Sequence, residues 1–173
     1  MASVELRFSE ETIRETVRRI AQELSRSYSG GCPVVVGVLK GSFIFLADLV
    51  RELTIPCEID FIRARSYGAG VSSSGKVDII KDVEIELRGR DVVVVEDIAD
   101  SGLTLKTVIA RLRSREPASL RCCALLVREG QSAPDFFGFT IGSEFVIGYG
   151  LDHAERYRGL REIYALTGER GRS

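Results

Sequence analysis

The chain of 173 residues contains no tryptophan, a single histidine and only four cysteines, at positions 32, 57, 122 and 123. No two cysteines form a Cys-x-x-Cys pair, and one histidine cannot complete a Cys/His ligand set. This composition argues against a zinc site. We therefore expect all four cysteines to be reduced, buried thiols, as is usual in the cytosol.

The sequence also lacks an excess of charge of either sign, because 24 basic and 25 acidic side chains leave a formal net charge of −1. A general nucleic-acid-binding protein is usually strongly basic, so binding of nucleic acid is not expected. No apolar run approaches the ~20 residues that a membrane span needs. The N-terminus has neither the basic nor the apolar region of a secretory signal. These absences predict a cytoplasmic protein that does not bind membranes.

Hydrophobic residues make up 45% of the chain, which is ordinary for a soluble globular protein. A chain of this length can bury a core of its own, and it shows neither an internal repeat nor a linker. We therefore predict a single domain over residues 1–173.

Apolar runs alternate with stretches of helical periodicity along the chain. Four of the runs have no polar alternation, which is typical of strands buried on both faces in a parallel sheet. The pattern predicts an α/β fold with a mostly parallel central sheet flanked by helices. The predicted helices are 9–28, 43–53 and 105–115, and the predicted strands are 33–39, 57–63, 77–80, 83–87, 92–95, 120–127 and 144–148. Residues 128–143 and the tail after 151 are predicted to be irregular.

The most informative segment is the loop predicted over residues 96–104, which follows four consecutive valines. Ligands of open α/β sheets bind beyond the carboxyl ends of the strands. A glycine, two hydroxyls and backbone N–H groups at the start of a helix are suited to a phosphate monoester. This segment supplies them in Asp100, Ser101, Gly102, Leu103 and Thr104.

Glu96 and Asp97 repel a phosphate, so they are better suited to sugar hydroxyls or to a hard divalent cation. The alternative is that Asp100 and Ser101 only cap the following helix. Three carboxylates within five residues repel one another unless a cation or hydroxyls offset the charge, and this favours a binding role.

The stretch from Glu96 to Thr104, EDIADSGLT, resembles the phosphoribosyl-diphosphate signature of type I phosphoribosyltransferases. Its form is similar to that of the hypoxanthine-guanine branch, and the resemblance extends from about residue 34 to about residue 160. It implies a small hood, built from the N- and C-terminal segments, beside the central sheet. In that family, residues matching Glu96 and Asp97 face the ribose hydroxyls and Mg²⁺. The residue matching Asp100 lies near purine N7 as the general base, and loop 100–104 holds the 5-phosphate.

The stretch Val-Leu-Lys-Gly-Ser at 38–42 resembles the family's diphosphate loop, in which a cis peptide presents backbone N–H groups. The resemblance assigns Lys40 and Gly41 to substrate binding. Alone, Lys40 also fits an exposed residue at a helix start. Ser66 and Tyr67 match the dipeptide of a mobile lid, predicted at about 65–75, which excludes water from the reacting centre. The alternative for this Gly/Ser-rich stretch is a surface loop.

The stretch FVIGYGLD, beginning at Phe145, resembles the base-binding segment of the hood, which we place at about 128–165. The resemblance implies that Phe145 stacks on the purine and that the Val146 backbone meets its Watson–Crick edge. Asp152 would serve a second Mg²⁺, and Arg158 would bind diphosphate. We expect His153 to be exposed and not catalytic.

Arg128 stands where the family usually has a lysine that donates to the purine 6-oxo group. Arginine can donate the same hydrogen bond, but its planar guanidinium is bulkier than an ammonium group, so the exchange is not neutral. Base preference is therefore open at this position.

The resemblance implies a Mg²⁺-dependent transfer of the phosphoribosyl group to hypoxanthine or guanine by a homodimer or homotetramer. Two alternatives stay open. The chain could act on another base, such as xanthine, or it could be a regulator that senses phosphoribosyl diphosphate and binds RNA, although its net charge weakens the second reading.

Overall fold

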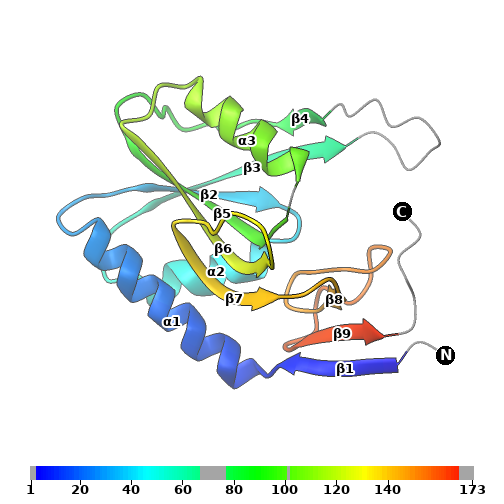
Figure 1. Cartoon of the computed structure of the whole chain (residues 1–173). Coiled ribbons are helices and arrows are strands. Elements are labelled where there is room, and N and C mark those ends of the chain that lie inside the picture. The colour runs from blue at the N-terminus through cyan, green and yellow to red at the C-terminus, as the bar shows by residue number, and fades with distance from the viewer. Residues whose placement is uncertain (1–2, 67–76, 101, 168–173) are drawn as a thin grey trace.

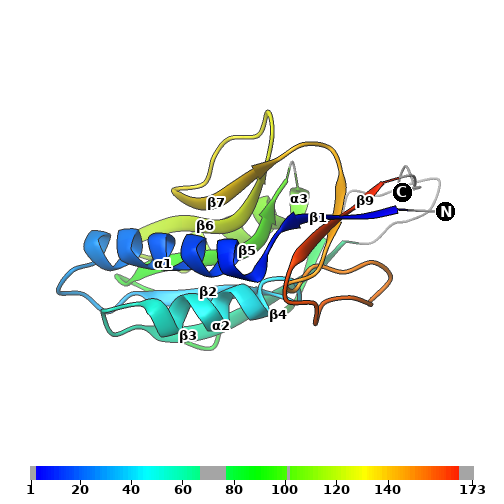
Figure 2. The ribbon, with the colours of Figure 1, turned by 90° about the horizontal axis from the view of Figure 1, so that it is seen from below.

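The computed structural model describes residues 3–66, 77–100 and 102–167. A six-stranded sheet lies between helices, and a three-stranded sheet stands beside it (Figures 1 and 2). The helices of the described residues are α1 (Glu10–Ser27), α2 (Phe43–Glu52) and α3 (Leu103–Arg113). The fold class predicted from the sequence is confirmed.

The central sheet has the strand order β4-β3-β2-β5-β6-β7. Its neighbours pair in parallel, except that β3 and β4 are antiparallel. Val34 of β2 is in register with Glu58 of β3 and Val92 of β5, so these strands begin at about the same level and run in the same direction. The bounds are β2 (Val34–Leu39), β3 (Glu58–Ser66), β4 (Val77–Lys81), β5 (Asp91–Ala99), β6 (Ser119–Arg128) and β7 (Phe136–Ile141).

Successive valines of β5 face opposite sides of the sheet, as the strand geometry requires. Val93 and Val95 pack in the cluster that contains the buried residues of α1 and α2, whereas Val92 and Val94 pack with Val108 of α3. Figure 2 shows α1 and α2 together on one face. The apolar stripe predicted for α1 is confirmed, because all four of its members are buried: Ile13, Val17, Ile20 and Leu24.

The hood sheet has the order β1-β9-β8 with antiparallel pairing. It joins β1 (Ser3–Phe8) to β8 (Phe145–Ile147) and β9 (Ile163–Thr167), so it combines both ends of the described chain (Figure 1). The ring of Phe8 stacks on Phe139 of β7 with centroids 3.9 Å apart, and this contact joins the hood to the central sheet. The tail after residue 151 was predicted to be irregular, which is wrong for β9.

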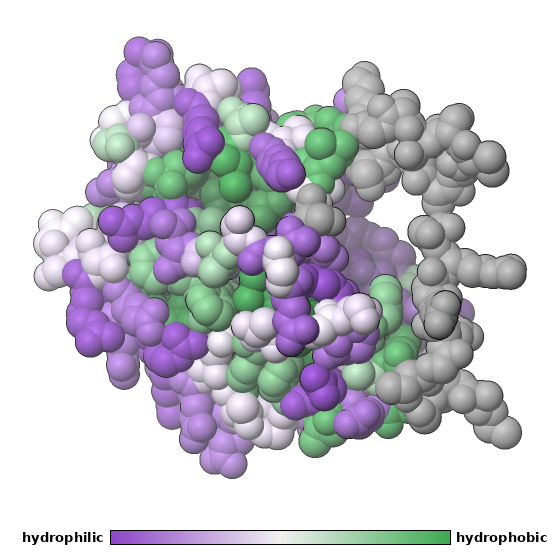
Figure 3. Space-filling view, in the orientation of Figure 1, coloured by the Kyte–Doolittle hydropathy of each residue, from purple (hydrophilic) through white to green (hydrophobic). Residues whose placement is uncertain are grey.

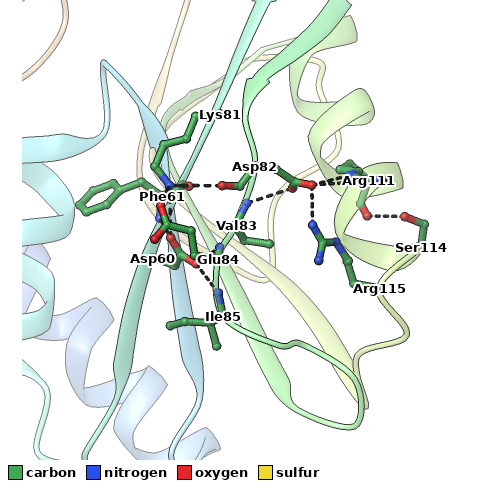
Figure 4. A network of polar contacts seen from close by, with 10 residues as sticks. All are labelled: Asp60, Phe61, Lys81, Asp82, Val83, Glu84, Ile85, Arg111, Ser114 and Arg115. Atoms are coloured by element: carbon green, nitrogen blue, oxygen red, sulfur yellow. Dashed lines mark hydrogen bonds and ion pairs between the residues drawn. The ribbon is translucent and has the colours of Figure 1, made fainter.

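The strand predicted over residues 83–87 is wrong, and Figure 4 shows the reason. The backbone N–H groups of Glu84 and Ile85 donate to the buried carboxylate of Asp60, at 2.6 and 2.9 Å, instead of to another strand. The neighbouring Asp82 accepts hydrogen bonds from Arg111 and Arg115 at the end of α3. Side chains from β3 and from the end of α3 thus hold this segment where a strand was expected.

Two further boundaries differ from the sequence prediction. Glu96 to Ala99 is not loop but the end of β5, because β6 continues far enough to pair with it, with Glu96 opposite Ala124. Residues 128–143 contain β7, whose Gly138 lies so close to β6 that a β-carbon there would be 2.4 Å from the Leu125 carbonyl oxygen. The glycine that weakened the strand signal is what lets β7 approach.

All four cysteines are free thiols, but only Cys123 is buried. Cys57 and Cys122 are half-buried and Cys32 is exposed, so the expectation of four buried thiols is wrong. Burial, and then the nearby carboxylates of Glu96 and Asp135, raise the pKa of Cys122 to about 12. In the described ranges, no helix combines the length and the apolar character that crossing a membrane requires.

Candidate active site

The predicted site residues gather where β2 and β5 end side by side. Since the two strands are parallel and in register, their carboxyl ends meet at one edge of the sheet. The loop after β2 and the start of α3 lie there, and the hood stands opposite (Figure 1). Polar surface gathers between the central sheet and the hood (Figure 3).

The loop after β2 carries a cis peptide bond between Leu39 and Lys40, as the resemblance implies. Ser42 is fully buried, and its hydroxyl donates to the Val38 carbonyl oxygen at 2.7 Å before α2 begins. A β-carbon at Gly41 would lie 1.7 Å from Oδ2 of Asp97, so only glycine fits at this position. The Asp97 carboxylate therefore rests against the backbone of this loop.

Glu96 and Asp97 are adjacent carboxylates at the end of β5. Burial, and then the charge of Asp97, raise the pKa of Glu96 well above its usual value. Oδ1 of Asp97 accepts from the Ile98 N–H at 2.8 Å. No cationic side chain contacts Glu96 or Asp97 in the described part of the chain. Two carboxylates in this state attract a cation or hydroxyl donors.

The carboxylate pair suits Mg²⁺, which usually takes one or two protein carboxylates and keeps waters and substrate phosphate oxygens as its other ligands. The described residues hold no group of three acidic, histidine or cysteine side chains that could enclose a metal alone. The residues present therefore fit a metal ion that arrives with a phosphorylated substrate.

The N-terminus of α3 follows directly after β5, with Gly102 as N-cap residue. In the described ranges no side chain caps this end, so its first N–H groups stay available to an anion. Asp100 is exposed, Leu103 is 49% exposed, and Ser101 lies outside the described residues. This end of α3 has the geometry of a phosphate site.

Arg128, at the end of β6, lies beside Asp100. Its Nε donates to Oδ2 of Asp100 at 3.2 Å, and its Nη1 donates to the carbonyl oxygens of Gly142 and Glu144 at 2.5 and 2.8 Å. Three contacts hold the guanidinium in one orientation and link β6 to the turn before Phe145. Nη2 makes none of these contacts.

Phe145 is 39% exposed, and its ring meets His153 edge-on with centroids 5.5 Å apart. The side chain of Val146 points the other way and is buried in the main core. His153 is exposed, as expected from the sequence. Strand alternation thus presents the Phe145 ring outward and anchors the hood through Val146.

A hood turn contacts the loop after β2 directly. A β-carbon at Gly150 would lie 2.1 Å from the Gly41 carbonyl oxygen. Arg158 donates from Nη1 to the Gly150 carbonyl oxygen at 2.8 Å, and its Nη2 lies 2.6 Å from Asp152. Lys40 pairs with Glu155 at 2.9 Å. Asp152 is thus neutralised by Arg158, unlike Glu96 and Asp97.

The structure brings together the predicted residues of β5, β6, the loop after β2 and the hood. Tyr67 and Ser101 lie outside the described residues, as does most of the predicted lid, and nothing is described of the Ser66 side chain. Sequence reasoning missed Gly150 and Glu155 as parts of this site. Gly150 stands in the sequence Gly-Tyr-Gly, and its φ of +99° is a conformation that favours glycine.

The family model of the phosphoribosyl transferase domain matches residues 9–154, which is most of the chain. The chain belongs to the phosphoribosyltransferase family. It is 45% identical to the hypoxanthine phosphoribosyltransferase of Salmonella typhimurium, over 91% of this chain and 92% of that protein. It is 43% identical to the hypoxanthine-guanine phosphoribosyltransferase of Bacillus subtilis, over 91% and 90%.

Among solved structures, this phosphoribosyltransferase is similar to a hypoxanthine-guanine phosphoribosyltransferase from Bacillus anthracis that has a HEPES molecule in its active site. The TM-score is 0.87 and the identity 41%, over 93% of this chain and 97% of that one. A hypoxanthine phosphoribosyltransferase from Staphylococcus aureus gives a TM-score of 0.88 at 37% identity, over 94% and 90%.

Proposed function

We propose that this phosphoribosyltransferase transfers the 5-phosphoribosyl group of phosphoribosyl diphosphate to N9 of hypoxanthine or guanine, forming IMP or GMP and releasing diphosphate. The observation that carries the proposal is the Arg128–Asp100 pair beside Phe145. It offers a fixed donor and an acceptor side by side, which matches the 6-oxo group and the N7–H of a 6-oxopurine. The names of the relatives support the same substrates.

The ribose 5-phosphate part of phosphoribosyl diphosphate is assigned to β5 and α3. The N–H groups at the start of α3, with Gly102, Leu103 and Thr104, hold the 5-phosphate, together with Ser101. Glu96 and Asp97 accept hydrogen bonds from the ribose hydroxyls. They would also hold Mg²⁺, which would supply positive charge to offset that of the diphosphate leaving group.

The diphosphate is assigned to the loop of Lys40 and Gly41 and to Arg158. Backbone N–H groups of this loop face the leaving group, and Arg158 supplies a permanent positive charge. The buried Nε of Arg158 has no hydrogen-bond partner in the described residues, which is consistent with a ligand completing its shell. Asp152, which pairs with Arg158, would be the ligand of a second Mg²⁺.

The base is assigned to Phe145, the Val146 backbone, Arg128 and Asp100. Nη2 of Arg128 donates to the 6-oxo oxygen. As purine N9 bonds to the anomeric carbon and the C–O bond to diphosphate breaks, the N7 proton passes to the Asp100 carboxylate. Ser66 and Tyr67 are assigned to the lid that keeps water from this centre.

A spectrophotometric assay with hypoxanthine, guanine, xanthine and adenine, Mg²⁺ and phosphoribosyl diphosphate tests the proposal. We expect turnover of hypoxanthine or guanine and none of adenine, whose 6-amino group is a donor. Asp100→Asn is expected to lower kcat by about 10²- to 10⁴-fold, the usual contribution of a general base. Asp91→Asn, at the opposite end of β5, is the matched control.

Full turnover by Asp100→Asn would contradict the general-base assignment, and an order of base preference unchanged in Arg128→Lys would contradict the role of Arg128. Turnover of none of the 6-oxopurines would overturn the function itself. We also propose a cytoplasmic homodimer or homotetramer, and light scattering after size-exclusion chromatography gives the number of subunits.

A further inference from the structure

One buried tyrosine, Tyr149, connects the hood turn at residues 148–151 to α2. This is the turn that contacts the loop of Lys40 and Gly41. Tyr149 is 7% exposed and belongs to the main core. Its hydroxyl donates to Oδ2 of Asp48 on α2 at 2.6 Å. Burial, and then this bond to Asp48, raise the pKa of Tyr149. The hydroxyl therefore remains a hydrogen-bond donor at every physiological pH.

The backbone around Tyr149 adopts a conformation with positive φ, which glycine takes readily and L-amino acids rarely take. Gly148, Tyr149 and Gly150 have φ values of +97°, +50° and +99°. Their N–H groups donate to the carbonyl oxygens of Leu151, Leu160 and Arg158, respectively. A non-glycine residue persists in this region only where the surroundings specify it, and the Asp48 bond is the side-chain part of that specification.

The same turn contacts the loop of Lys40 and Gly41 directly and is also bonded to the helix that follows this loop. Gly150 packs against the Gly41 carbonyl oxygen, and Gly41 in turn packs against the Asp97 carboxylate. Asp48 lies on α2, the helix that starts immediately after this loop. A displacement of Tyr149 would therefore move Gly150, and with it Gly41 and the Arg158 guanidinium that donates to the Gly150 carbonyl oxygen.

We propose that Tyr149 and Asp48 are positioning residues for diphosphate: their hydrogen bond holds the 148–151 turn against Gly41, so that the loop amides and Arg158 are in place before the substrate binds. The proposal rests on the proposed assignment of Lys40, Gly41 and Arg158 to diphosphate. Neither residue needs to touch the substrate. Because the loop amides and Arg158 are already held in place before the substrate binds, they lose less conformational entropy on binding, so diphosphate binds more tightly.

Tyr149→Phe tests the proposal because it removes the hydroxyl and keeps the ring in the core. We expect KM for phosphoribosyl diphosphate to rise about fivefold, the loss that one hydrogen bond accounts for, while KM for hypoxanthine changes less than about twofold. Calorimetric titration of inorganic diphosphate with Mg²⁺ should show the same weakening. Tyr164→Phe, a tyrosine of β9 in the hood, is the matched control and should bind diphosphate like the unmodified protein.

Asp48 supplies the second half of the test. Asp48→Asn keeps an oxygen that can accept from Tyr149 and should retain binding, whereas Asp48→Ala should reproduce Tyr149→Phe. The double variant Tyr149→Phe with Asp48→Ala should be no weaker than either single variant, because both remove the same bond.

Equal rises in both KM values, an unchanged KM for phosphoribosyl diphosphate, or additive losses in the double variant would overturn the positioning role. Thermal unfolding of each variant identifies a loss that comes from stability alone, which would lower the maximal rate with both substrates without raising KM for phosphoribosyl diphosphate selectively. If the unmodified protein does not bind diphosphate, or if Arg158→Ala binds it equally well, the site assignment fails instead. The two failures are therefore distinguishable.

Discussion

Two pairs of acidic side chains lie on the same central sheet in opposite electrostatic conditions. Asp60 lies in β3 and Asp82 directly follows β4, and each accepts hydrogen bonds from several donors (Figure 4). Glu96 and Asp97 end β5, where each has the other's negative charge as its neighbour. Both pairs are partly or fully withdrawn from water, so burial alone does not distinguish them.

The pKa values of Asp60 and Asp82 shift in the opposite direction from that of Glu96. Burial alone would raise the pKa of Asp60, but N–H donors from Ile85, Phe61 and Glu84 bring it below its usual value. Burial likewise opposes the lowered pKa of Asp82, which Arg111 and Arg115 produce. For Glu96, burial and Asp97 act in the same direction and raise the pKa.

A carboxylate whose charge is satisfied within the chain has a structural role, because its partners are already in place. A carboxylate pair left with mutual repulsion is destabilising by itself and becomes favourable only with a ligand. The contrast therefore separates the part of the sheet that holds the fold from the part that binds substrate.

The largest expected effect is on catalysis, at the end of β5. Glu96→Gln and Asp97→Asn should each lower kcat/KM by about 10- to 100-fold, the range seen when groups that orient a bound metal are lost. The unfolding free energy of the ligand-free protein should not fall, since each change removes a repulsion. Steady-state kinetics and urea unfolding measure the two quantities. A variant that keeps full activity, or that loses stability, would break the contrast.

The next effect is on stability, at Asp60. Asp60→Ala should lower the unfolding free energy by about 2 kcal/mol, because buried N–H groups of the 84–85 segment lose their acceptor. Below the unfolding transition, kcat should remain close to that of the unmodified protein. Denaturant unfolding monitored by circular dichroism gives the first value. Asp60→Asn keeps one acceptor oxygen, so its unfolding free energy should lie between those of the unmodified protein and of Asp60→Ala.

Acid should weaken the same region. Asp60 and Asp82 have lowered pKa values in the folded state, so the unfolded state binds protons first as the pH falls. Their stabilisation is complete above about pH 4, the usual value for aspartate, and is lost as the pH falls through their folded values. Thermal unfolding from pH 6 downward should show this loss, and Asp60→Asn should reduce its slope. A slope unchanged in that variant would assign the acid sensitivity elsewhere.

The smallest effect is expected for Asp82 alone. Asp82→Asn should cost less than about 1 kcal/mol, since Arg111 and Arg115 are partly exposed and solvent screens the pair. Urea unfolding at low and high salt tests this, because the cost should shrink as salt rises. A cost that equals that of Asp60→Ala would show that the Arg111 end of α3 is a main support of the β3–β4 flank.

Much of the fold could be predicted from local pattern. The valine runs of β2 and β5 predicted buried strands, and the apolar stripe of α1 predicted a helix packed on the core. The burial of these residues confirms both predictions. The strands that escaped prediction depend on a neighbour. β1 and β9 pair with each other from opposite ends of the chain, β7 contains Gly138 against Leu125, and the end of β5 is acidic but pairs with β6. The residues at 83–87 have strand-like composition, but Asp60 takes their N–H groups.

The candidate site shows the same division. The chemical types and spacing of the residues from Glu96 to Thr104 predicted binding of a phosphate and a cation. The resemblance assigned Lys40, Phe145 and Arg158 to substrate binding. The contact of Gly150 with Gly41 and the bond of Tyr149 to Asp48 join segments about a hundred residues apart. No local spacing encodes such contacts.

The sequence by itself determined the alternation of strands and helices, the family, and the chemical groups available for binding, because each depends on residues close together in the chain. Only the tertiary structure decided which of those groups are satisfied. Whether a carboxylate meets an arginine, as Asp82 does, or is left with only the carboxylate next to it in the sequence, as Glu96 is, depends on which distant segments the folded chain places beside it. Electrostatic energy depends on distance in space, and that distance exists only after folding.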